Sequence, residues 1–487
     1  MPLKRYFKIF ILFIVLFSGL FAFLFFEFQP SAQTAQAAGD YHYVRAGAAG
    51  LNNGSDWTNA WTSLPAVLVR GDIYYIADGT YGAYVFNDAV SGELYITIKK
   101  AIESDHGTDA GWNSSYGDGQ AAFTASSGDI WVFGSSYYVI DGQFGELDQT
   151  FGIRAYVSSG NVKVVRISPG VNHINMSYLD LQHKGYSYNS TEGNGADVLY
   201  MVDIGRTNPI EDIYFYKVWL HDVNRVHVYA YNIAGCVWNN CWFTERYNED
   251  VFAVHGESFT IFNSVNQNKR NVIKNSVFRN VEGTGIIVFQ DMAPAADNYN
   301  WDIYNNIFYR DGARVNDGWT AGNAPTIDDF DTTDGQIADT GSNNYNFNIY
   351  GNTFFNTLGR GFDFYGENNA SGQPSIYQNI SVHNNLIVNH VGSFEIEGTD
   401  VSNNFITNDP AVFSDYLNMK FTLSRPTNEG MTLLSPYNID MLGNTRGSDG
   451  VWDIGAYEYI SASVPEPEPE PEPDTTPPSA PLGVVAN

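Results

Sequence analysis

The chain has 487 residues, of which 44% are hydrophobic, 15% aromatic and 16% charged, with 46 Gly, 32 Tyr and 32 Phe. This composition is too apolar for a disordered chain and too polar for a protein with many membrane spans. With 25 Lys and Arg against 54 Asp and Glu the net charge is −29, and so acidic a surface argues against nucleic acid as a partner.

The first 37 residues have the pattern of an export segment. Three basic residues precede an apolar run at 9–26, and small residues with an A-x-A pattern at Ala35 and Ala37 follow. The run exceeds the usual signal-peptide core of about 7–15 residues and reaches the length of one membrane span. A cleaved signal peptide and a retained anchor both remain open. Either predicts a secreted or cell-surface protein that meets the membrane only through this segment.

A short sequence pattern recurs beyond residue 236. Each copy is an apolar strand that runs into an Asn and then into a second apolar stretch, and the copies lie 35, 31, 46, 33 and 19 residues apart. Strands of 4–6 residues bounded by Asn, Gly and Asp predict stacked β-coils, a β-solenoid. Asn tolerates the left-handed backbone of a sharp corner, and its amide can bond the Asn of the next coil as a ladder. The repeated residues are Asn240, Asn275, Asn306, Asn352, Asn385 and Asn404.

Two further segments match this pattern to a known family. The opening at 41–72 is followed by Ile-Ala-Asp-Gly-Thr-Tyr at 76–81, and the repeats close with Asp-Ile-Gly-Ala-Tyr-Glu at 453–458. With these features, residues 41–460 resemble the right-handed parallel β-helix superfamily of pectate-lyase-like proteins. The resemblance implies an all-β, right-handed, single-stranded parallel β-helix with an asparagine ladder and corner loops. It leaves the activity open, because the superfamily holds lyases, hydrolases, epimerases and adhesins.

Changes in composition predict four segments. Residues 1–37 form the signal or anchor, 38–460 the β-helix, and 461–474 a Pro/Glu-rich linker that favours an extended polyproline II rod. Residues 475–487 resemble the first strand of a fibronectin type III domain and are too few to fold as a sandwich, so we expect an incomplete module there; a frayed Pro-rich tail is the alternative.

The only two cysteines, Cys236 and Cys241, are predicted to be small buried thiols. Five residues of extended chain cover about 16 Å, whereas a disulfide needs Cα atoms about 4.4–6.8 Å apart.

The densest group of reactive side chains falls on two consecutive coils. A filled β-helix has no interior site, and adjacent coils stack about 4.8 Å apart, so polar groups after the strands can converge on the outside. A glycosidase needs an acid and a carboxylate about 5–5.5 or 6.5–9.5 Å apart, which Asp222, Glu249 and Asp250 can supply. The alternative is that these residues cap turns and decorate the surface. The candidate catalytic residues are His221, Asp222, Arg225, Glu249, Asp250 and His255.

A lyase requires a base and a cation beside the carboxylate of a uronic acid. Arg314 and Arg360 each lie eight residues beyond a repeated Asn, so a row of arginines along one corner is a candidate uronate-binding surface. Trp319 is a candidate for stacking on a sugar ring. The alternative is that the arginines bond loop carbonyls and the tryptophan packs.

An acidic run in the longest insertion is a candidate Ca²⁺ loop. Ca²⁺ takes 6–8 oxygen ligands, which clustered carboxylates supply, although an acidic surface loop fits equally well. The candidate ligands are Asp328, Asp329, Asp331 and Asp334.

Together these observations predict an exported, monomeric β-helix protein that engages polysaccharide as a lyase or a glycoside hydrolase. The alternative is a non-catalytic adhesin or glycan-binding module.

Overall fold

Short strands with alternating inward and outward side chains build nearly all of the structure. In the computed structural model β5 (Ile96–Lys100) and β9 (Ile153–Val157) alternate strictly between buried and half-exposed residues, the pattern of a sheet with one face on a core. The structure describes residues 39–145, 150–157, 162–183, 197–223, 225–246, 257–265, 268–281, 285–290, 297–311, 335–357, 360–364, 368–369 and 371–460.

One parallel sheet, sheet B, has nine strands among the residues that the structure describes. Its strands are β4 (Tyr84–Phe86), β7 (Trp131–Phe133), β10 (Val165–Ile167), β12 (Leu199–Val202), β14 (Val228–Tyr231), β18 (Phe259–Phe262), β21 (Gly285–Gln290), β24 (Gly335–Thr340) and β27 (Phe362–Asp363).

The other large sheet, sheet A, has 22 strands in the described part of the chain and bends along a corner into two arms. Arm one contains β1 (Tyr41–Val44), β2 (Ile73–Ile76), β5, β8 (Tyr138–Asp141), β15 (Ile233–Ala234), β16 (Val237–Asn239), β19 (Asn271–Lys274), β22 (Asp297–Tyr304), β25 (Asn343–Tyr350), β28 (Tyr377–His383) and β30 (Asp400–Ser402). Arm two contains β3 (Gly79–Tyr81), β6 (Ala121–Ala125), β9, β17 (Trp242–Arg246), β20 (Val277–Val281), β23 (Ile307–Tyr309), β26 (Thr353–Phe355), β29 (Leu386–Val388) and β31 (Phe405–Thr407). The long strands β11 (Asn172–Gln182) and β13 (Ile210–Val223) pass through both arms.

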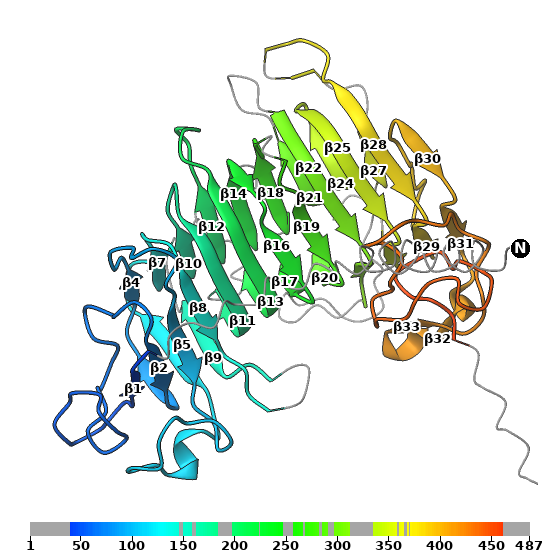
Figure 1. The fold of residues 1–487 in the computed structure, drawn as a ribbon. Helices are drawn as coiled ribbons and strands as arrows, with labels where there is room; N and C mark the ends of the chain where they lie inside the picture. The colour runs from blue at the N-terminus through cyan, green and yellow to red at the C-terminus, as the bar shows by residue number, and fades with distance from the viewer. Residues whose placement is uncertain are drawn as a thin grey trace, which may run out of the picture.

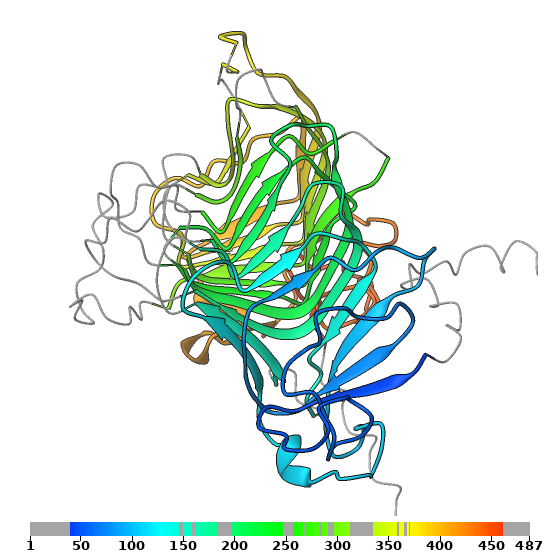
Figure 2. The same ribbon diagram turned by 90° about the vertical axis from the view of Figure 1, so that its left-hand side faces the viewer.

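Each coil runs from arm one through arm two to sheet B, and every strand pairs in parallel with its equivalent in the next coil. The colour therefore changes steadily along the stack in Figure 1, and Figure 2 views the stack from its N-terminal end. This topology is a parallel β-helix, which confirms the fold predicted from the sequence.

The corner between the two arms carries the asparagine ladder. The Nδ2 of Asn306 donates to Oδ1 of Asn352 (3.0 Å), Asn352 to Asn385 (2.9 Å), and Asn385 to Asn404 (2.9 Å). Asn306, Asn352 and Asn385 are fully buried. These four residues confirm the predicted ladder.

The register differs from the prediction at the first two repeats. Trp242 pairs with Val277 and Val277 with Ile307, so Cys241 and Ser276 occupy the ladder column next to Asn306. Asn240 and Asn275 lie one residue earlier, where the backbone is left-handed with φ of +54° and +51°. These two residues supply the left-handed backbone of the corner and do not belong to the ladder. The same left-handed column continues through Asn305, Gly351, Asn384 and Asn403.

Inside the coils, aromatic rings stack in register. Phe243, Phe278, Phe308 and Phe354 follow one another with ring centroids 4.7, 4.5 and 4.5 Å apart. Both cysteines are fully buried and free, as expected from their spacing.

After β31 the chain folds back along the side of the stack. The hairpin β32 (Phe413–Asp415) and β33 (Lys420–Leu423) packs Phe413 and Phe421 against Phe355 of arm two. A short 3-10 helix at Pro410–Val412 precedes this hairpin, a second at Tyr416–Asn418 joins its two strands, and another lies at Ser114–Tyr116 near the N-terminal end.

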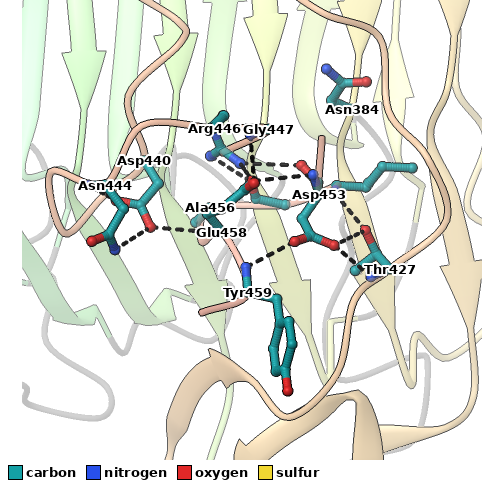
Figure 3. A network of polar contacts seen from close by, with 12 residues as sticks. Asn384, Thr427, Asp440, Asn444, Arg446, Gly447, Asp453, Ala456, Glu458 and Tyr459 are labelled. Carbon is teal, nitrogen blue, oxygen red and sulfur yellow. Dashed lines mark hydrogen bonds and ion pairs between the residues drawn. The ribbon is translucent and has the colours of Figure 1, made fainter. Parts of the chain in front are cut away.

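The closing segment binds the left-handed corner column. Buried Arg446 donates to Oδ1 of Asn305 (2.9 Å) and to the Gly455 carbonyl (2.8 Å), while Asn384 donates to the Met431 carbonyl (2.7 Å). Figure 3 shows the network around Arg446, in which Glu458 accepts from the backbone N–H of Gly447 (2.6 Å). The motif at 453–458 therefore fastens the chain end to the corner.

Among residues 39–460, outside the gaps given above, no helix is long and apolar enough to cross a membrane. The predicted export segment, linker and fibronectin-like segment lie outside the described residues.

Candidate functional site

The outer face of sheet B brings polar and aromatic side chains from different coils into one column. Arg166 of β10, Tyr200 of β12, Tyr229 of β14 and Thr260 of β18 are paired in register. The strand neighbours of Arg166, Tyr200 and Tyr229 point inward and are buried, so these three half-exposed side chains face outward, whereas Thr260 is fully buried.

Two tyrosine rings stack at the centre of this column, with cations around them. The rings of Tyr200 and Tyr229 are 5.7 Å apart and nearly parallel, at 5°. Lys163 and Arg166 lie 4.9 and 4.8 Å from the centroid of Tyr200, and Arg225 lies 4.4 Å from that of Tyr229. These are cation–π distances.

Two carboxylates hold the cations in place. Nζ of Lys163 lies 2.7 Å from Oδ2 of Asp197, and Arg225 approaches the same oxygen at 3.3 Å. Arg166 contacts Asp129 at 2.5 Å. In the described part of the chain, these three cations contact the two carboxylates Asp129 and Asp197. We call this group the cationic cluster; it consists of Asp129, Lys163, Arg166, Asp197, Tyr200, Arg225 and Tyr229.

Burial separates the roles within the cationic cluster. The Asp197 side chain is fully buried and that of Lys163 is 8% exposed, whereas the Arg166 side chain is 36% exposed. Burial lowers the pKa of Lys163, helped by the charges of Arg225 and Arg166, and Asp197 opposes the shift. Lys163 is thus easier to deprotonate than an ordinary lysine, and Arg166 is the cation that solvent reaches best.

A second group of charges lies on the outer face of arm two. His221 of β13 bonds Oδ1 of Asp180 through Nε2 (2.8 Å) and Oδ2 of Asp222 through Nδ1 (2.9 Å). Gln182 donates to Asp222 (2.7 Å), and Arg154 contacts both Gln182 and Asp180. We call this group the imidazole cluster; it consists of Arg154, Asp180, Gln182, His221 and Asp222.

The imidazole is closed off from solvent. His221 is 5% exposed, and its ring stacks on Trp219 at a centroid distance of 3.7 Å and 14°. Since both ring nitrogens already bond carboxylates, no free position remains for proton exchange with a substrate. This geometry favours a structural role for the charge of His221.

The structure divides the sequence-predicted catalytic residues between these clusters. His221 and Asp222 lie together in the imidazole cluster, whereas the Arg225 side chain bonds Asp197 and belongs to the cationic cluster. Glu249, Asp250 and His255 lie outside the described residues.

Of the predicted substrate-binding residues, only Arg360 is described. It is 55% exposed and bonds Asp363 at 2.7 Å. Asp363 lies in the same outward column as Arg166, six strands along sheet B, or roughly 29 Å at the usual strand spacing. Arg314 and Trp319, and the candidate Ca²⁺ ligands Asp328, Asp329, Asp331 and Asp334, lie outside the described residues.

In the part of the chain that the structure describes, no three His, Cys, Asp or Glu side chains gather as they would around a metal ion. The Ca²⁺ hypothesis rests on residues outside that part.

Most of the cationic cluster was not found from the sequence. Its signal is a polar or aromatic residue between two apolar ones, as in Val-Arg-Ile at 165–167 and Leu-Tyr-Met at 199–201. That signal is read only when successive coils are aligned, and coil lengths here vary too much for alignment without coordinates.

The sequence matches no protein-family model and no curated protein. Among solved structures the chain is similar to pectate lyase Pel9A, with a TM-score of 0.47 and 15% identity over 87% of this chain and 98% of that one. It is also similar to a PL6 family polysaccharide lyase from Pseudopedobacter saltans, with a TM-score of 0.30 and 14% identity over 76% of this chain and 94% of that one. Both likenesses concern the fold, which the strand registers establish independently, and neither carries a conclusion about activity.

Proposed function

We propose that this protein binds an acidic polysaccharide along the outer face of sheet B and cleaves it by β-elimination. The observation that carries the proposal is the cationic cluster itself. A chain with 25 basic and 54 acidic residues gathers three cations on one sheet face, around two stacked tyrosines. Such a concentration against the overall charge marks a surface for an anionic ligand.

The geometry suits a repeating polymer. Arg166, Tyr200 and Tyr229 follow one another on adjacent strands about 4.8 Å apart, so a chain that lies along this part of sheet B meets one strand after another. Arg166 presents a planar guanidinium that binds a carboxylate through two hydrogen bonds. The tyrosine hydroxyls add donors and acceptors for sugar hydroxyls.

Lys163 is the candidate base for the reaction. In its neutral form the amine takes the proton from the carbon next to the uronate carboxylate. The electron pair of that C–H bond forms a C=C bond, the neighbouring C–O bond breaks, and the departing oxygen takes a proton from water. Arg166 and Arg225 would stabilise the charge that develops on the carboxylate.

A second candidate function is binding without cleavage. The contact of 2.7 Å between Lys163 and buried Asp197 favours the ammonium form, which cannot act as a base. In that case the same face is a glycan-binding surface of an adhesin-like protein.

Incubation with polygalacturonate and with a neutral glucan separates these functions. Unsaturated, ultraviolet-absorbing products from polygalacturonate support elimination, and new reducing ends without absorbance indicate hydrolysis. Retention without product supports the binder. Absence of both retention and product with polygalacturonate would overturn the proposal for this polymer class.

Three variants assign the effect to the site. We expect Lys163→Met to lower elimination by at least about 100-fold and Arg166→Gln to weaken binding by about tenfold. Arg166 is partly exposed, so its replacement should leave the fold intact even if Lys163→Met destabilises the buried Asp197. Arg425→Gln is the matched control, because Arg425 is an exposed arginine paired with Asp409 in the C-terminal segment.

We further propose that the protein works outside the cytoplasm as a monomer. The export pattern of the first 37 residues supports the location. Detection of the protein in the culture medium or on intact cells tests the location, and light scattering tests the oligomeric state.

A further inference from the structure

We infer that the imidazole cluster positions the turn that carries Arg225. The positive charge of His221 completes the hydrogen bonds of this cluster. This inference rests on the proposed function, since it concerns the presentation of one cation of the cationic cluster. It assigns His221 and Asp222 a role in positioning rather than in proton transfer.

The turn joins arm two to sheet B. Strand β13 ends at Val223 and β14 begins at Val228, so Arg225 lies between them. Arg225 must reach Asp197, in the preceding coil, to join the cationic cluster. The position of its guanidinium therefore depends on how firmly both ends of the turn are held.

Histidines fasten both ends of this turn to neighbouring coils. At the β14 end, His227 is fully buried and bonds the hydroxyl of Ser258 (3.1 Å) and the Thr244 carbonyl (3.0 Å). At the β13 end, Asp222 bonds His221 and Gln182. Asp222 has a φ of +53°, a left-handed conformation that is unfavourable for a non-glycine residue and that such bonds help to hold.

The bonds of Asp222 depend on the charge of its neighbours. From β9, Arg154 faces Asp180; from β11, Asp180 faces His221, and Gln182 faces Asp222; on β17, Thr244 accepts a bond from Trp219. The backbone N–H of His183 donates to the His221 carbonyl (3.3 Å), and the charge of His227 also acts on Asp222.

Arg154 and protonated His221 are the two cations that contact the carboxylates Asp180 and Asp222 directly. If His221 loses its proton, Arg154 is the one cation left in direct contact, and one of the carboxylates loses its donor from the ring. The imidazole cluster is therefore complete only while His221 is protonated.

The protonated form is the favoured one. Burial by itself lowers the pKa of His221, but the hydrogen bonds and charges of Asp180 and Asp222 outweigh burial and raise it above its ordinary value. A raised histidine pKa gives stabilisation that is complete below about 6.5 and is lost as the pH rises through the folded-state pKa. The pKa of Asp222 is lowered, so its contribution is lost only in acid.

The test uses His221→Gln in the full chain, with His383→Gln as the matched control. His383 is also buried and faces a carboxylate, Asp400 at 3.3 Å, but it lies on arm one near the C-terminal end of the stack. Hydrogen exchange of the peptide covering residues 222–228 reports the turn directly. We expect faster exchange there in His221→Gln and no change in His383→Gln.

Two further measurements test whether the charge of His221 affects the turn. NMR titration of the histidine side chains should show one that titrates above the ordinary value of about 6.5 and that disappears in His221→Gln. Binding of polygalacturonate should weaken about fivefold as that histidine titrates, and in His221→Gln it should be weak at every pH.

Unchanged exchange at 222–228 in His221→Gln, or ordinary titration of His221, would overturn the inference. If the wild-type chain does not bind polygalacturonate at all, the proposed function fails for that polymer. The exchange and titration results would still decide whether His221 holds the turn.

Discussion

The ladder corner and the outer face of sheet B are both columns in which one position of the coil is repeated, but they differ in content. At the corner, Asn306, Asn352, Asn385 and Asn404 repeat the same side chain, and each buried amide bonds the next. On sheet B the column changes from Arg166 to Tyr200, Tyr229 and Thr260, with charges beside it.

The difference separates structure from function. Identical amides satisfy one another and leave nothing for a ligand, so their repetition stabilises the stack. A column that changes residue from coil to coil and gathers charge gains nothing from repetition. Its side chains are therefore the better candidates for recognition.

The largest effect should follow from breaking the ladder. In Asn352→Ala, four hydrogen bonds are lost, to the backbone N–H and Nδ2 of Asn306, to Asn385 and to the Ile303 carbonyl. We expect a loss of about 3–5 kcal/mol in the free energy of unfolding, measured by denaturant titration, with polysaccharide binding unchanged in the folded fraction.

The control for the ladder is Asn379→Gly. Asn379 belongs to an exposed row on the outside, where it donates to Asn346 (2.9 Å) with a φ of +58°. Glycine keeps that backbone, so a loss of at most about 0.5 kcal/mol is expected. Equal losses in the two variants would contradict the distinction between buried and exposed rows.

A smaller effect is expected where the closing segment meets the corner. A Cβ on Gly455, at a φ of +108°, would lie 2.8 Å from Oγ1 of Thr353 and 2.9 Å from Cβ of Leu386. Gly455→Ala should cost about 2–3 kcal/mol by thermal or denaturant unfolding. Gly443 has a φ of +90° but nothing within 4 Å of an added Cβ, so Gly443→Ala should lower the free energy of unfolding by about 1 kcal/mol. A larger loss there than at Gly455 would rule out the contact with Thr353 and Leu386 as the cause.

On sheet B we expect substitutions to change polysaccharide binding more than the free energy of unfolding. Because the cationic cluster binds through charge, raising the salt concentration should weaken the binding of polygalacturonate by about tenfold in the wild type. Arg166→Gln should show a smaller salt dependence, with the unfolding free energy lowered by no more than about 1–2 kcal/mol, because Asp129 loses one charged donor. Binding isotherms at two ionic strengths measure this, and identical salt dependence in both would exclude Arg166 from the binding surface.

The smallest effect on stability is expected from the two buried thiols, Cys236 and Cys241. Cys241 occupies the ladder column beside Ser276. Burial raises the pKa of both thiols to about 12. The native protein should therefore show no reaction with a thiol reagent at pH 8, and two thiols should react after denaturation. Because the unfolded thiols ionise near pH 8.5, this burial makes the fold less stable as the pH rises above that value. Rapid labelling of the native chain would mean that the coil opens locally at this corner.

The fold was within reach of the sequence because its signals are local. Short apolar runs that end in Asn specify both the strands and the left-handed corner, and four of the six repeated asparagines are in the ladder as predicted. Asn240 and Asn275 were assigned to the wrong column, because adjacent positions both accept Asn: one for its backbone conformation and the next for its amide.

Only the tertiary structure decided the site. Arg225 lies four residues from His221 in the sequence, yet the turn that carries it brings its side chain against Tyr229 of sheet B. Lys163 and Asp197 are 34 residues apart and form an ion pair. Closure of each coil brings such residues together, and the loops set the length of each coil. Local composition therefore determines which strands form, whereas coil length determines which side chains meet across them.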